Sequence, residues 1–112
     1  MTGAFGPGGP PVATNGITPV AVVTAPGASK QRQALSVAPR NRDTVPHIYT
    51  LQRNKASTIF YLAEVYVDAG KTGQLISNCY VVAGTDDSLE VLVDKAATTT
   101  ESEVDVSYFE VP

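Results

Sequence analysis

The sequence predicts an all-β protein, a small antiparallel β-sandwich or barrel of about five to seven strands with an extended N-terminal arm. The first observation is that the opening 29 residues carry no charged side chain and are rich in glycine and proline, a composition that excludes a helix. The second is that β-branched and aromatic residues alternate with polar ones after residue 46. The third is the spacing of turn-forming stretches, roughly 8–12 residues apart, which is typical of short antiparallel strands.

Charge divides the 112 residues into segments of different character. Residues 1–29, 30–55 and 56–112 have net charges of 0, +5 and −8, which together give the −3 of the whole chain. We therefore predict an arm over residues 1–29, a basic connector over residues 30–45 and a β domain over residues 46–112. This layout favours contacts with like molecules, or with a partner of patchy charge, over binding to nucleic acid.

The clearest predicted strand covers residues 57–68, STIFYLAEVYVD. Simple alternation places one set of side chains on one face (Ile59, Tyr61, Ala63, Val65, Val67) and another set on the opposite face (Phe60, Leu62, Glu64, Tyr66, Asp68). Further strands are predicted over residues 47–52, 74–84, 88–94 and 103–111. In the strand at residues 88–94, Leu89, Val91 and Val93 face inward while Glu90 and Asp94 face outward. Gly70 and Gly73 are expected to form a hairpin loop, and residues 84–88 to form the next turn.

Five short strands make a thin core, which predicts that oligomerisation or docking on a larger surface stabilises the domain. The strand at residues 57–68 is apolar on both faces as far as Glu64, so part of its cover is expected to come from another subunit. The single cysteine, Cys79, cannot form an internal disulfide, and its apolar surroundings predict a small buried side chain.

No motif indicates catalysis, a metal or a cofactor. The sequence AGKTG at residues 69–73 resembles the end of a phosphate-binding loop, but Val65 stands where that loop needs glycine, and a strand follows. His47 is the only histidine and is interpreted as a residue at the start of a strand. Asp86, Asp87 and Glu90 could form a cation loop or an acid–base pair, but adjacent acids in a turn are better explained as solvated turn formers. The chain is therefore predicted not to be an enzyme.

Nucleic-acid and membrane binding are also disfavoured. The basic residues 30–55 contain one aromatic residue, Tyr49, and the acidic remainder would repel a phosphate backbone. The apolar run at residues 20–23 lies between two prolines and is too short for a signal peptide or a membrane span. These features predict a chain that is made and kept in a reducing cytoplasm, or that is assembled there before release.

An uncharged arm that includes TAPGAS at residues 24–29, a basic connector and a compact acidic β domain together resemble the decoration, or cement, proteins of tailed bacteriophage heads. The resemblance implies a virion protein on the capsid surface whose partners are the major capsid protein and copies of itself, with a trimer as one arrangement. It also implies that the arm clamps neighbouring capsid subunits and so stabilises the shell. This chain differs from the head decoration proteins of the lambda type in that it has no Trp and has a regular succession of predicted hairpins.

Under this hypothesis, eight residues bind the partner. Four apolar side chains would fill notches in the capsid, and four basic ones would meet its acidic surface: Phe5, Ile17, Val20 and Val22, then Lys30, Arg32, Arg40 and Arg42. Two alternatives stay open, namely a tail or neck component and a polysaccharide-binding or cell-surface module. The second needs an exposed aromatic platform, whereas alternation assigns most of its candidates to packed faces (Tyr61, Tyr66, Tyr80, Tyr108).

Overall fold

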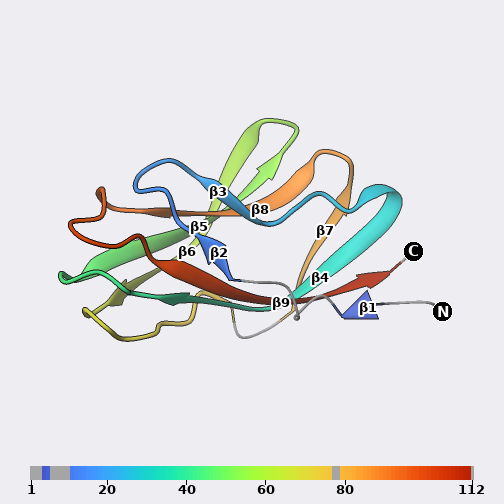
Figure 1. Cartoon of the computed structure of the whole chain (residues 1–112). Coiled ribbons are helices and arrows are strands. Elements are labelled where there is room, and N and C mark those ends of the chain that lie inside the picture. The colour runs from blue at the N-terminus through green and yellow to red at the C-terminus, as the bar shows by residue number, and fades with distance from the viewer. Residues whose placement is uncertain (1–3, 6–10, 77–78, 112) are drawn as a thin grey trace.

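The computed structural model describes residues 4–5, 11–76 and 79–111, which fold into a sandwich of two antiparallel sheets without helix (Figure 1). The predicted all-β sandwich is thus confirmed. The strands are β1 (Ala4–Phe5), β2 (Val12–Ala13), β3 (Val20–Val23), β4 (Gly27–Arg40), β5 (His47–Lys55), β6 (Thr58–Val67), β7 (Tyr80–Gly84), β8 (Asp87–Val93) and β9 (Glu103–Val111). One sheet has the order β1-β9-β4-β7, with β2 also on β9, and the other has the order β3-β8-β5-β6.

The core lies between the two sheets and is built by alternate residues of each strand. In β8, Leu89, Val91 and Val93 are buried and face the core, while Glu90 and Asp94 point outward, as predicted. Tyr49 and Leu51 of β5 are fully buried beside them, and β4, β7 and β9 supply the opposing layer (Ala34, Val37, Val82, Val104). Period-two burial of this kind is what a sandwich requires.

Residues 11–29 do not form a separate arm, so this part of the prediction is wrong. β2 pairs with β9, and β3 pairs with β8 at the edge of the second sheet. Val22 and Val23 are buried in the core, although Pro19 and Pro26 flank the strand. The four residues of β3 are enough for one edge strand between these prolines, because an edge strand forms ladder hydrogen bonds on one side only. Residues 1–3 and 6–10 of the predicted arm lie outside the described residues.

The predicted basic connector is also wrong, because residues 30–40 belong to β4, which lies between β9 and β7 in the first sheet. The register between β4 and β9 shifts at Leu35, a bulge that brings both Ala34 and Val37 to the core. A bulge resets the alternation by one residue, so the strand does not read as regular in sequence. Consequently, neither residue 29 nor residue 45 marks a domain boundary.

The hairpin loop predicted at Gly70 and Gly73 is wrong, because the strands on either side of it do not pair with each other. β5 and β6 do form a hairpin, around Ala56 and Ser57. β6 and β7 lie in different sheets, as do β7 and β8, so the glycines at 70 and 73 and the turn at 84–88 serve crossovers between the layers. A Cβ on Gly73 would lie 2.6 Å from Cγ2 of Val67, so glycine allows the crossover to pack on β6.

Candidate functional site: an exposed strand edge beside buried ion pairs

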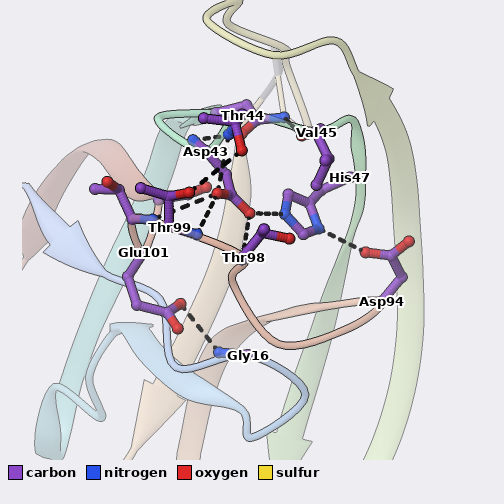
Figure 2. Close-up of polar contacts among 12 residues, drawn as sticks. Gly16, Asp43, Thr44, Val45, His47, Asp94, Thr98, Thr99 and Glu101 are labelled. Atoms are coloured by element: carbon purple, nitrogen blue, oxygen red, sulfur yellow. Dashed lines mark hydrogen bonds and ion pairs between the residues drawn. The ribbon is translucent and has the colours of Figure 1, made fainter.

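The densest polar cluster joins Asp43, His47 and Asp94 at one end of the sandwich (Figure 2). His47 is buried, with Nε2 2.7 Å from Oδ2 of Asp43 and Nδ1 3.0 Å from Oδ1 of Asp94. Because carboxylates only accept hydrogen bonds, both ring nitrogens donate and the ring is an imidazolium. Burial alone would lower the pKa of His47, but the hydrogen bonds to both aspartates outweigh it and raise that pKa above 6.5.

The Asp43 carboxylate also anchors the loop that precedes β9. Its oxygens accept the backbone N–H groups of Thr44 at 2.9 Å, and of Thr98 and Thr99 at 2.8 Å (Figure 2). The hydrogen bond from His47, followed by that from Thr98, holds the pKa of Asp43 well below its usual 3.8. His47 is buried and each of its ring nitrogens faces a carboxylate of the same chain, so neither nitrogen is turned toward a substrate site. The cluster is therefore a fold-stabilising device that ties the turn before β5 to the loop before β9.

A second buried carboxylate, Asp87, pairs with Arg53 in two hydrogen bonds of 2.7 and 2.6 Å. It also accepts the N–H of Ala83 at 3.0 Å. Burial would raise the pKa of Asp87, but the Arg53 guanidinium outweighs this and lowers it below 3.8. The interpretation of Asp87 as a solvated turn former is thus wrong, because Asp87 is the first inward-facing residue of β8.

The acids of this turn do not converge on one point. Asp86 is exposed, and Glu90 lies on the outward face, where Gln52 donates to it at 2.8 Å. Among the described residues, no group of three or more His, Cys, Asp or Glu side chains is placed to hold a metal ion. In the same part of the chain, no helix is long and apolar enough to cross a membrane.

Three of the four basic residues predicted to bind a partner form ion pairs with β9 of their own chain. Arg32 binds Glu110 at 2.7 Å, Arg40 binds Asp105 at 2.7 Å, and Arg42 binds Glu103. The cause is the antiparallel register, which sets the basic strand β4 against the acidic strand β9. Lys30 is exposed. The opposite charges of the two sequence segments thus meet largely inside one molecule.

The four apolar residues predicted to bind a partner differ in how far they are buried. Val22 is buried and Val20 is half-buried, so both serve the sandwich. Ile17 is 66% exposed at the tip of a turn in which Thr18 N–H donates to the Asn15 carbonyl at 3.0 Å. Phe5 pairs through its backbone with Phe109, and its side chain lies outside what the structure describes. Ile17 and Lys30 are therefore exposed, as are Arg40 and Arg42, whose exposed side chains pair with acids of their own chain.

The strand that the sequence predicted to be covered partly by another subunit is β6, and the structure places it at the edge of its sheet with a different set of exposed side chains. Tyr61 is 75% exposed, Tyr66 61% and Phe60 50%, and Ile59 is also exposed. The register with β5 shifts at Leu62, a bulge that places Ala63, Val65 and Val67 inward but turns Tyr61 and Ile59 outward. The prediction that alternation puts Ile59 and Tyr61 on the same face as Ala63, Val65 and Val67 is therefore wrong, as is the assignment of Tyr61 and Tyr66 to packed faces. The signal in the sequence was the apolar character of both faces of this segment.

Beside β6 lies an open cavity of about 280 Å³ between the two sheets. It is lined by apolar residues of β5, β6 and the crossover to β7 (Leu51, Leu62, Ala63, Leu75, Ile76, Cys79, Tyr80). Cys79 is exposed there, which corrects the prediction that it is buried. The cavity shows that the sandwich is less completely filled on its β6 side.

No protein-family model matches the chain, and no curated protein matches it in sequence.

Proposed function

We propose that this chain is a structural virion protein that binds the outside of a phage capsid and stabilises it, as the resemblance to head decoration proteins implies. Its partners in this proposal are capsid subunits and copies of itself. The observation that carries it is that large apolar side chains stay exposed on the described surface, among them Ile17 at 66% on a turn and Tyr61 at 75% on the outer strand β6. Clustered exposed apolar side chains mark contact surfaces for other proteins.

The polar chemistry of the chain supports an assembly role over an enzymatic one. The buried side-chain nitrogen and oxygen atoms of the described residues all have hydrogen-bond partners, and His47 and Asp87 serve ion pairs. Such fully paired groups stabilise a fold, and this is the role that the proposal gives them.

The structure changes which residues we propose for clamping the capsid. Since residues 11–29 complete the sandwich, we assign capsid contact to residues 1–10, which carry no charge, and to Ile17 at the exposed turn. Uncharged segments bind through backbone hydrogen bonds and apolar contacts, and many copies on one shell add their weak contacts together.

Co-sedimentation with purified capsids tests this proposal. The full chain should sediment with heads, and removal of residues 1–10 or the change Ile17→Asp should reduce the bound fraction about tenfold or more. Thr85→Asp, at another exposed turn, is the matched control and should bind like the unchanged protein. Sedimentation with isolated tails but not with heads would contradict the proposal and favour a tail or neck component.

A polysaccharide-binding module is a second candidate, favoured by the exposure of Tyr61 and Tyr66 on the same face of β6. Exposed aromatic rings can stack on sugar rings. A glycan array would show binding that Tyr61→Ala abolishes if this candidate is right, and an array without hits would remove it.

A further inference from the structure

β6 differs from the other edge strands of the sandwich. Within the described residues it pairs with β5 alone, so its second edge carries unpaired backbone groups. The other outer strands are short, with five residues in β7, four in β3 and two each in β1 and β2, whereas β6 has ten. Short edges, prolines and lysines protect natural sheets from unwanted pairing. β6 has none of these, and Glu64 is its one charged residue.

The bulge gives β6 a face pattern that is symmetric about its centre. Leu62 is the additional residue, and it lies beside the midpoint of Thr58–Val67. On one side of it Ile59 and Tyr61 point outward, and on the other side Glu64 and Tyr66 do, as their β5 partners show. The remaining residues of the strand lie on the inward side of the sheet, where Thr58 and Phe60 stay exposed and Val67 is buried.

This symmetry matters when the strand is paired antiparallel with a copy of itself. In the register centred between Leu62 and Ala63, outward residues oppose outward residues and inward residues oppose inward ones along the whole strand. The pairs are Thr58 with Val67, Ile59 with Tyr66, Phe60 with Val65, Tyr61 with Glu64, and Leu62 with Ala63. A shift by one residue would set outward side chains against inward ones. A shift by two residues would still match Phe60 with Val67 and Tyr61 with Tyr66, but it would set Ala63 against Glu64. The register centred between Leu62 and Ala63 is therefore the one that matches along the whole strand.

We propose that two copies of this chain associate through β6, antiparallel about a two-fold axis between Leu62 and Ala63, to join their four-stranded sheets into one continuous sheet. An antiparallel strand that pairs with itself forms a closed, isologous contact, which is the commonest symmetry of soluble dimers. The proposal deepens the proposed function, since it names the occupant of one exposed surface and leaves Ile17 and residues 1–10 for the capsid.

Charge and side-chain chemistry agree with a second copy as the occupant. Glu64 would oppose Tyr61 of the partner subunit, so the two carboxylates would not face each other directly, which avoids like-charge repulsion. The exposed rings of Tyr66 and Phe60 would each oppose a β-branched residue, Ile59 or Val65, and such cross-strand pairs stabilise sheets.

The first test is the native mass of the purified full chain over a series of concentrations, by analytical ultracentrifugation. We expect twice the 11.7 kDa of one chain. Tyr66→Lys should raise the dissociation constant about tenfold or more, because the lysine is placed at both ends of the contact. The matched control is Ala21→Lys, an exposed site on β3 at the opposite edge of the same sheet, which should leave the mass unchanged. A monomer throughout the micromolar range, or a mass of three chains, would overturn the proposal.

Disulfide trapping tests the register itself in a Cys79→Ser background, which removes the single native cysteine. Ile59→Cys and Tyr66→Cys chains should cross-link when they are mixed, because these positions oppose each other across the axis. Each variant alone should not, because equivalent residues would be seven positions, about 23 Å, apart, beyond disulfide reach. Cross-linking of either variant with itself, or none in the mixture, would refute this register. These tests use the purified chain alone, so their failure is distinguishable from failure to bind capsids.

Discussion

Removal of residues 1–29 should unfold the protein, whereas removal of residues 1–10 should leave it folded. The longer deletion takes away β3, whose Val22 and Val23 are buried at 7% and 1% exposure. Burial of a valine is worth about 1.5–3 kcal/mol, so the two side chains together contribute about 3–6 kcal/mol. The deletion also uncovers the outer edge of β8, where Leu89 and Val91 are fully buried. A domain of this kind has a net free energy of unfolding of about 5–15 kcal/mol, so most of the stability would be lost.

Urea denaturation followed by circular dichroism measures the loss of stability. The single substitution Val23→Ala perturbs the same strand less than the deletion does. This change should lower the free energy of unfolding by about 2 kcal/mol, since two buried carbon atoms are lost and a small cavity is left. Val81→Ala is the matched control, because Val81 is 38% exposed on β7, and it should cost well under half as much. A protein without residues 1–29 that still unfolds cooperatively within about 1 kcal/mol of the full chain would refute the reasoning.

Three further predictions concern particular side chains. Arg53→Met should cost about 3 kcal/mol, because the buried Asp87 carboxylate loses its two hydrogen bonds to the guanidinium and keeps only the Ala83 N–H and the more distant Lys55. The double variant Arg53→Met/Asp87→Leu should regain much of that loss in urea denaturation, whereas equal losses would contradict a coupled pair. The pKa of His47 is raised in the folded state, so the stabilising effect of its charged form is complete below pH 6.5 and is lost as the pH rises through the raised value. Tm should therefore fall over that pH range. His47→Gln should flatten this dependence of Tm on pH, and an unchanged slope would contradict the prediction. Ala56 and Ser57 have φ of 51° and 67°, so Ala56→Asn/Ser57→Gly should stabilise the β5–β6 hairpin by about 1 kcal/mol, and a lower Tm would argue against it.

Strand content was predictable from the sequence where alternation is uninterrupted. Residues 88–94 and 47–52 show this, because Leu89, Val91 and Tyr49 recur at period two and the structure buries them. Alternation fails at the bulges of Leu35 and Leu62, where one extra residue reverses the faces of everything that follows. No local pattern marks a bulge, because its position depends on the partner strand.

The organisation of the first 29 residues and of the polar clusters was not predictable, for a related reason. β3 is only four residues long between prolines, and its burial depends on β8, almost 70 residues later in the chain. His47 is likewise held by Asp94, 47 positions away. Such long-range pairs are set by sheet order, which composition and charge zones do not encode. The charges of the segments did indicate one feature correctly, since the oppositely charged segments pair with each other as β4 and β9.

Hydrogen–deuterium exchange at two protein concentrations tests most directly whether β6 is a contact surface between subunits. Backbone N–H groups on its outer edge should exchange slowly in concentrated protein and rapidly on dilution, while those of β7, the corresponding edge of the other sheet, should exchange at the same rate in both samples. Exchange within Thr58–Val67 that does not change with concentration would contradict the account.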